Sequence, residues 1–387
     1  MKILLAADEN KTLMNGAAGV VINLENSLRE LGHEVKVLTL SPTEQGMKDG
    51  DDYYLPSHPV WMYPAFRQTR VRNHPYIDEI IAWNPDIIHV HTEGSCARIA
   101  RKISGMTGAP FIMTVHTYYE KFAFHKLSGT KIVNLLFRIL AAYFLRGAKV
   151  LTVPSAKGKK VLRGYKVKKP IFVIPNGIKL DRFQKEFSKE EKAALLKKLG
   201  LSGSTGIFVV VSRISAEKKL DELLEFFGDV VRADSGASLI IAGDGPIMEE
   251  LKMQAAGPEL AGHVVFTGMI PQEELYRYYK SGIAFLSASD FEMHSLTYLE
   301  AISCGLPLIC RDDPCLEGVL ENKVNGFAWK TREEFVSGCL SLIKDKELQK
   351  RFSEASLRIS ENFGAKTCAA RMARLYAKVC KKNKGRR

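Results

Sequence analysis

Two glutamates eight residues apart, Glu292 and Glu300, are the first candidates for chemistry in this 387-residue sequence. Both follow an apolar run that reads as a buried strand; we expect Glu292 in a loop and Glu300 inside an apolar helix. A carboxylate on an apolar helix face is costly unless it has hydrogen-bonding partners, and vicinal ribose hydroxyls are suitable ones. The loop and helix start between them, at Ser295 and Leu296, would offer backbone N–H groups to a pyrophosphate. The pair alone equally fits a helix-capping glutamate and a core ion pair.

Cations and glycine turns follow other predicted strands in the same half of the chain. Arg213 and Lys218 stand five residues apart just after the apolar run 209–211, where positive charge would neutralise a diphosphate leaving group. Gly243 and Gly245 form a tight turn after the run 240–242, and residues 266–268 repeat the arrangement. Such turns bring backbone close to a ligand, although a single one is more often only a turn.

Strand and helix signals alternate along the chain, which predicts two successive open α/β domains with parallel, doubly wound sheets. Ligands of such sheets bind beyond the carboxyl ends of the strands, so we expect chemistry at His91, Thr92, His116 and Thr117. The expected strands are 3–7, 35–40, 86–91, 111–116, 150–154 and 171–174 in the first half, and 207–211, 238–242, 264–266, 283–286 and 308–310 in the second.

The predicted domain boundaries follow from this alternation. We expect an N-terminal Rossmann-like domain at 1–180, a C-terminal one at 181–362, and a helix with a basic tail at 363–387 that crosses back to the first domain. The stretch 181–200 is charged and reads as a linker.

In their order, these motifs resemble glycosyltransferase family 4, a family of retaining GT-B enzymes. The family pattern R-x4-K, G-x-G-P, F-x-G and E-x7-E-A-x-x-x-G-x-P matches from Arg213, Gly243, Phe266 and Glu292 onward. The resemblance runs from the first strand to at least Phe327 and implies two Rossmann-like domains facing a central cleft, the first binding the acceptor and the second the nucleotide sugar. The first half matches at Asn15-Gly16, Gly32–Val35, Asp86–His89, Thr114–Thr117 and Ile174–Ile178.

The resemblance also implies roles for single residues. Arg213 and Lys218 would hold the donor phosphates, Glu300 the ribose and Glu292 the sugar hydroxyls, while His116 would face the donor sugar from the opposite domain. One departure is Ser295, which stands where the family usually has glycine and whose Cβ restricts the loop. The catalytic candidates are His116, Glu292, Arg213 and Lys218, and the donor-binding candidates are Gly16, Arg213, Lys218, Gly243, Gly245, Ile270, Glu292, Ser295, Leu296 and Glu300.

The acceptor is suggested by two segments, 116–120 and 296–301, which look most like those of bacterial 1,2-diacylglycerol 3-glucosyltransferases. This resemblance implies a UDP-sugar donor, taken as UDP-glucose, and a lipid acceptor such as diacylglycerol; a polysaccharide or other soluble acceptor is the alternative. Residues 101–182 carry 17 Lys and Arg against 2 Asp and Glu, which favours an anionic membrane surface as partner. The segment contains Tyr118, Tyr119, Phe122, Phe124 and an apolar helix on which Lys131, Arg138, Arg146 and Lys149 would form one basic stripe.

Other features limit the remaining classes of function. No apolar run approaches the roughly 18 residues of a membrane-spanning helix. Seven scattered cysteines without a C-x-x-C pair indicate neither a zinc site nor a disulfide framework, so we expect a cytoplasmic protein, peripheral on the inner face of the cell membrane. Signatures of nucleic-acid-binding modules are missing, so no nucleic acid is expected as partner. The sequence shows no metal-binding carboxylate cluster, and the resemblance implies a metal-independent, retaining reaction without a tightly bound cofactor.

Overall fold

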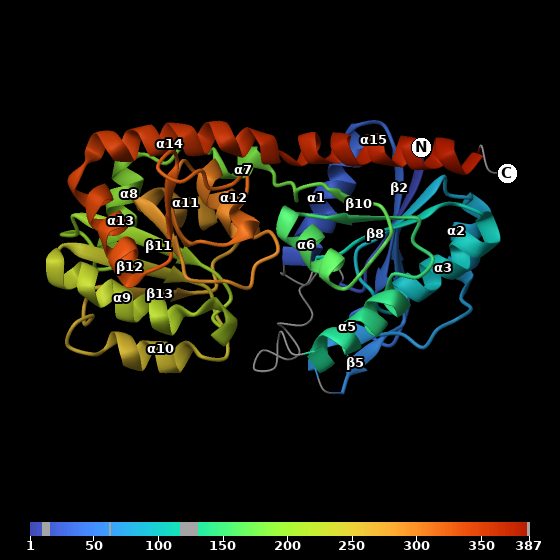
Figure 1. Cartoon of the computed structure of the whole chain (residues 1–387), viewed down its shortest axis with the longest axis horizontal. Helices are drawn as coiled ribbons and strands as arrows, with labels where there is room; N and C mark the ends of the chain where they lie inside the picture. The colour runs from blue at the N-terminus through green and yellow to red at the C-terminus, as the bar shows by residue number, and fades with distance from the viewer. Residues whose placement is uncertain (10–15, 62, 117–130, 385–387) are drawn as a thin grey trace. The chain divides into compact units, whose positions relative to one another are not determined.

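The computed structural model describes residues 1–9, 16–61, 63–116 and 131–384, and it divides into two compact units (Figure 1). Unit 1 comprises Met1–Gly177 and Ala365–Arg387, and unit 2 comprises Ile178–Gly364. Each unit is an α/β structure built around its own sheet.

Unit 1 is built on an eight-stranded sheet with the order β10-β9-β8-β7-β1-β2-β4-β3, in which only β3 runs antiparallel to its neighbour. Its strands are β1 (Lys2–Ala6), β2 (Glu34–Leu40), β3 (Met47–Asp49), β4 (Asp52–Leu55), β7 (Ile87–Val90), β8 (Phe111–Thr114), β9 (Val150–Val153) and β10 (Ile171–Val173), beside a hairpin of β5 (His58–Val60) and β6 (Tyr63–Gln68). Its helices are α1 (Gly16–Glu30), α2 (Pro75–Trp83), α3 (Ser95–Thr107), α5 (Lys131–Phe144), α6 (Ala156–Gly164) and α15 (Ala365–Lys384).

Helices cover both faces of this sheet because successive side chains of a buried strand point to opposite sides. On β1, Ile3 and Leu5 pack in one hydrophobic cluster with α1 and α15. Leu4 and Ala6 belong to the cluster on the other face, with α2 and α3. The long C-terminal helix α15 is therefore part of the core of unit 1 although it is far from that unit in sequence.

Unit 2 is built on a six-stranded parallel sheet with the order β13-β12-β11-β14-β15-β16. Its strands are β11 (Gly206–Val211), β12 (Ala237–Ala242), β13 (Val264–Gly268), β14 (Ala284–Ser287), β15 (Leu308–Arg311) and β16 (Gly326–Trp329). Its helices are α7 (Leu180–Phe183), α8 (Lys189–Lys198), α9 (Leu220–Ala233), α10 (Met248–Ala255), α11 (Leu275–Ser281), α12 (Leu296–Ser303), α13 (Arg332–Lys344) and α14 (Lys346–Ser360), with short 3-10 turns η1 (Ala216–Lys218), η2 (Pro314–Leu316) and η3 (Glu361–Phe363).

The strand order reverses at β11, because β12 pairs on one side of it and β14 on the other. Helices α9 and α13 pack with Phe208 and Val210 on one face, and α7, α11 and α12 pack with Val209 and Val211 on the other. A reversal of this kind is where open α/β sheets bind ligands, at the carboxyl ends of the strands.

The two parallel-sheet units confirm the predicted fold class, and each predicted strand lies within a few residues of its expected place. The linker prediction for 181–200 is wrong, because these residues form α7 and α8, and a capping box between Ser188 and Glu191 starts α8. The single basic stripe is also wrong, since α5 ends at Phe144 and Arg146 and Lys149 lie beyond it.

Candidate active site

The loops after β11 and β12 lie against each other at two glycines, Gly243 and Gly245. The amide of Ser212 donates to the carbonyl of Ala242 (3.1 Å), and that of Ile214 donates to the carbonyl of Asp244 (2.8 Å). A Cβ on Gly243 would lie 1.8 Å from the Ser212 carbonyl oxygen, and one on Gly245 would lie 2.1 Å from that of Ile214. Only glycine permits this approach, so the turn supports the loop that carries Arg213. The donor-contacting role expected of both glycines stays a prediction.

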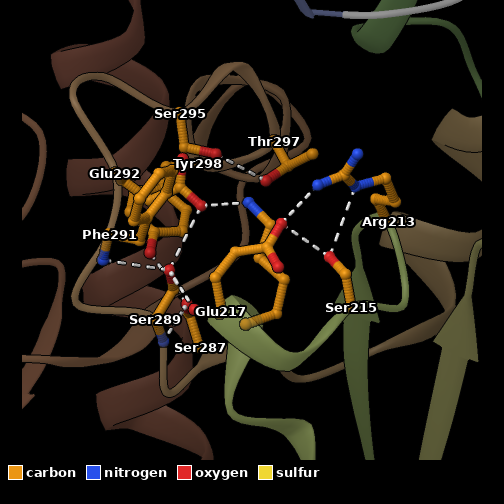
Figure 2. A network of polar contacts seen from close by, with 11 residues as sticks. Arg213, Ser215, Glu217, Ser287, Ser289, Phe291, Glu292, Ser295, Thr297 and Tyr298 are labelled. Atoms are coloured by element: carbon orange, nitrogen blue, oxygen red, sulfur yellow. Dashed lines mark hydrogen bonds and ion pairs between the residues drawn. The ribbon is translucent and has the colours of Figure 1, made fainter. Parts of the chain in front are cut away.

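Arg213 is the most exposed charged group of the site, with 60% of its side chain accessible. It forms an ion pair with Glu217, and its Nε donates to the Ser215 hydroxyl (3.3 Å), as Figure 2 shows. Burial raises the pKa of Glu217, but hydrogen bonds from Arg213 and Ser215 outweigh it and leave that pKa below the ordinary glutamate value. Glu217 was not among the predicted residues; its place four residues after Arg213 was the available signal.

Lys218 and Glu292 form a more deeply buried ion pair, with 19% and 14% of their side chains accessible. The Ser289 hydroxyl donates to the same carboxylate (3.3 Å) from within the loop after β14 (Figure 2). The ion pair itself joins this loop to η1. Beside this pair, Lys219 donates to Asp290 at 3.0 Å. The structure therefore brings two predicted residues, Lys218 and Glu292, into direct contact, and each of three cations has a carboxylate partner.

The start of α12 lies between the two glutamates of the motif. Ser295 is its N-cap residue, with φ −72° and ψ 128°, and its hydroxyl pairs with that of Thr297 (2.9 Å) instead of capping the helix. The negative φ is one that any residue adopts, so serine needs no glycine-like conformation here. The first-turn N–H groups, starting at Leu296, have no side-chain acceptor among the described residues and suit an anion.

Glu300 is buried in α12, with only 6% of the residue accessible. The Tyr279 hydroxyl of α11 donates to its Oε2 at 2.8 Å. Burial raises the pKa of Glu300 to about 6, while the Tyr279 hydrogen bond and the charge of Arg182 act in the opposite direction. Tyr279 is a partner that sequence reasoning missed, because nothing in the spacing connects α11 with α12. Ile270, a predicted donor contact, is half-buried and packs against the hydrophobic clusters of unit 2.

Unit 1 brings the predicted His91 and His116 together at the ends of β7 and β8. His91 Nδ1 and His116 Nε2 are 3.1 Å apart. Burial lowers the pKa of His116 to about 4 and that of His91 well below the ordinary histidine value. Thr92 instead has a structural contact, because its hydroxyl donates to Asp8 (3.0 Å), which also accepts the Cys96 amide of α3. Gly16 begins α1, whereas Asn15 and the predicted residues Thr117, Tyr118, Tyr119, Glu120, Phe122 and Phe124 lie outside the described residues.

Within the described ranges, no group of three or more His, Cys, Asp or Glu residues is arranged to hold a metal ion. None of the helices that the structure describes combines the length and apolar character needed to cross a bilayer.

Family models match both halves of the chain. The model described as Glycosyltransferase Family 4 matches residues 14–182, and the one described as Glycosyl transferases group 1 matches residues 191–358. An alpha-monoglucosyldiacylglycerol synthase of Streptococcus pneumoniae is 32% identical over 371 residues, which cover 94% of this chain and 84% of the relative. A synthase of the same name from Acholeplasma laidlawii is 26% identical, with coverage of 99% and 98%.

Solved structures agree with the fold. Anabaena Alr3699/HepE in complex with UDP-glucose has a TM-score of 0.76 at 16% identity, covering 98% of this chain and 100% of that one. Sucrose-phosphate synthase from Thermosynechococcus elongatus has a TM-score of 0.75 at 15% identity, covering 98% and 99%. The fold and the family models together define a glycosyltransferase of the GT-B architecture. The chain belongs to glycosyltransferase family 4.

Proposed function

We propose that this protein is a retaining glycosyltransferase that moves glucose from UDP-glucose to diacylglycerol at an anionic membrane surface. The observation that carries the proposal is the arrangement around α12, where Arg213 and the Lys218–Glu292 pair are followed by a helix start and the buried Glu300. The relatives named for glucosyldiacylglycerol synthesis support glucose and a lipid acceptor, and the solved complex with UDP-glucose supports the donor.

In this proposal different groups around α12 bind the diphosphate, the ribose and the sugar of the donor. The N–H groups of the first turn and the cations Arg213 and Lys218 hold the diphosphate, Glu300 accepts from the ribose hydroxyls, and Glu292 accepts from hydroxyls of the sugar. Glucose C1 loses its bond to the diphosphate oxygen and gains a bond to the acceptor oxygen on the same face. The acceptor proton leaves with the diphosphate, so no separate general base is required.

The ion pairs of the site suggest how charge stays balanced when the donor binds. Arg213 and Lys218 are each held by a carboxylate, Glu217 and Glu292. A diphosphate would compete with both carboxylates for these cations, and Arg213 is the easier to recruit because most of its side chain is exposed. The two cations would then stabilise the leaving group without a metal ion. His116 is proposed to take part in the transfer, and the acceptor is proposed to bind unit 1.

Membrane contact is supported by the exposed surface of unit 1. The outward residues of α5 are apolar: Leu135, Leu136, Ile139 and Tyr143 are all exposed. The exposed cations Arg146 and Lys149 follow directly, and the Arg146 guanidinium lies over the Tyr143 ring at 4.4 Å from its centre. An apolar helix face bordered by cations suits the interface of an anionic bilayer. Trp61, between β5 and β6, is 91% exposed and is of the residue type that anchors at such interfaces.

The acceptor surface and the chemistry are tested together on vesicles. We would follow transfer of labelled glucose from UDP-glucose to diacylglycerol in neutral and in anionic vesicles, together with sedimentation of the protein with each. We expect binding and product mainly with anionic vesicles. Ile139→Glu should abolish both, whereas Met253→Glu, at an apolar position of unit 2 that is at least as exposed, should change neither. Donor turnover to a soluble sugar without lipid product would contradict the lipid acceptor and keep the family assignment.

A further inference from the structure

Three histidines of unit 1 form a connected group at the ends of β7 and β8. His89 is held at both ring nitrogens, because Nδ1 lies 2.6 Å from the Tyr376 hydroxyl and Nε2 lies 2.6 Å from the Thr114 hydroxyl. Its ring packs against that of His91, with 4.1 Å between ring centres. The His89 ring cannot rotate without breaking both hydrogen bonds, so it is held in one orientation and the His91 ring packs against it.

His91 in turn contacts His116 through one hydrogen bond, between His91 Nδ1 and His116 Nε2 at 3.1 Å. Both rings line a cavity of about 30 Å³ whose described lining contains no Asp, Glu, Lys or Arg. Among the residues that the structure describes, the titratable groups beside them are Cys368 of α15, which also lines the cavity, and His89 with its partner Tyr376. None of these described groups stabilises an imidazolium, in agreement with the pKa of about 4 for His116. At neutral pH both rings are therefore uncharged, and an N–H of one ring donates to the unprotonated nitrogen of the other.

The direction of that hydrogen bond follows from the other nitrogen of His91. Its Nε2 is buried and has no hydrogen-bond partner among the described residues. A proton on this nitrogen would be a buried N–H without an acceptor, and such orphaned donors are rarer than unused acceptors. The proton of His91 then sits on Nδ1 and is donated to His116 Nε2. The proton of His116 must therefore sit on its own Nδ1.

We propose that His91 is a positioning residue that fixes the proton of His116 on Nδ1, so that His116 meets its substrate as an uncharged hydrogen-bond donor. The ligand group that this N–H would recognise is an oxygen of the sugar or of the leaving diphosphate. This assignment of the ligand rests on the proposed function. A ring with this low basicity holds such an oxygen without removing the proton of the acceptor hydroxyl.

The tautomer can be measured without any substrate, so its failure is distinct from a failure of the proposed function. In protein labelled with ¹⁵N-histidine, with His116 assigned through His116→Gln, we expect a protonated Nδ1 and an unprotonated Nε2 at pH 7. A protonated His116 Nε2 would overturn the proposal.

Two variants of nearly equal shape test the positioning. His91→Asn places an amide that donates to His116 Nε2, so it should keep the tautomer and stay within about fivefold of the wild-type kcat. His91→Asp places an acceptor there, which should move the proton to Nε2, raise the pKa of His116 and lower kcat about 10–100-fold with donor KM little changed. His74→Asn is the matched control, because His74 is the N-cap of α2 and asparagine caps helices well. Equal effects of Asn and Asp on kcat, with no change of tautomer, would show that His91 only fills space.

Discussion

Replacing the buried Glu300 by glutamine should make the protein more stable and a worse enzyme. The carboxyl group is almost inaccessible, receives one hydrogen bond from Tyr279, and has its pKa raised by burial to about 6. An acid whose pKa is raised in the folded state binds its proton more tightly there than in the unfolded chain. Stability is therefore highest below the unfolded pKa and falls as the pH rises through the folded pKa.

The size of the stability effect follows from the two pKa values. The difference between 4.5 and about 6 corresponds to on the order of 2 kcal/mol in the free energy of unfolding. This amount is lost when the pH rises from about 4.5 to above 6, because Glu300 then becomes a buried anion. Glutamine has the same shape, can still accept from Tyr279 and carries no charge. Glu300→Gln should therefore gain up to about 2 kcal/mol at pH 7 and nothing near pH 4.

The effect on donor binding has the opposite sign. In the proposed complex the carboxylate accepts hydrogen bonds from the ribose hydroxyls, and a hydrogen bond to a charged group is worth about 1.5–3 kcal/mol. Glutamine keeps one acceptor oxygen and loses the charge, so the loss of one such bond predicts a donor KM about 10–150-fold higher. For the wild-type enzyme, donor affinity should fall as the pH drops below about 6, where Glu300 of the free enzyme takes up a proton.

Two assays check both halves of this prediction. Urea unfolding at pH 4.5 and pH 7.5 gives the stability difference, and initial rates against donor concentration give KM. Tyr279→Phe is the companion variant, because it removes a hydrogen bond that lowers the pKa of Glu300. The pH below which donor affinity falls should therefore be higher in this variant than in the wild type. A Glu300→Gln protein that is less stable at pH 7.5, or that binds the donor as well as wild type, would refute the reasoning.

The remaining predictions concern the other groups of unit 2. Gly243→Ala should lower the free energy of unfolding by at least about 2 kcal/mol and reduce donor affinity. The new Cβ would clash with the Ser212 carbonyl, and the backbone at Gly243 has a φ of +140°, which alanine rarely adopts. Gly262→Ala, at φ +81° with open space around it, should cost only about 1 kcal/mol in the same denaturation experiment. Lys218→Met should lower kcat about 100-fold and destabilise the protein by about 3 kcal/mol by leaving Glu292 unpaired; an unchanged kcat at saturating donor would exclude Lys218 from leaving-group stabilisation. Ser295→Gly should leave donor KM within about twofold, since Ser295 already has an unstrained backbone, and a large gain in affinity would show that its Cβ obstructs the donor.

Much of the fold was predictable because buried parallel strands are short apolar runs, and each run that was expected to be a strand lies within a few residues of one. The hairpin of β5 and β6 was missed because β5 has only three residues and none of them is buried, so it carries no continuous apolar signal. The helices α7 and α8 were mistaken for a linker for a related reason. No residue of α8 is buried, so its composition resembles that of a loop, and only the capping box from Ser188 to Glu191 marked its start.

At the site, spacing predicted which residues matter better than it predicted what they touch. Arg213, Lys218 and Glu292 could be named from their places after strands, but the pairing of Lys218 with Glu292 joins loops 74 residues apart in sequence. The glycines of the turn after β12 indicated that the backbone approaches another group closely there. That group is the backbone of the neighbouring loop after β11. The meeting of His91 and His116 followed from adjacent strands ending at one edge, whereas the direction of their hydrogen bond needed the structure.

The most direct test of the central claim is the identity of the lipid product. The protein would be incubated with UDP-glucose and diacylglycerol in anionic vesicles, and the glycolipid would be extracted and its anomeric configuration determined by NMR. We predict a glucosyldiacylglycerol with the α linkage of the donor, formed by the wild type and not by Glu300→Ala. A β-linked product would contradict retention, and the absence of any glucolipid while UDP-glucose is consumed would contradict transfer to diacylglycerol.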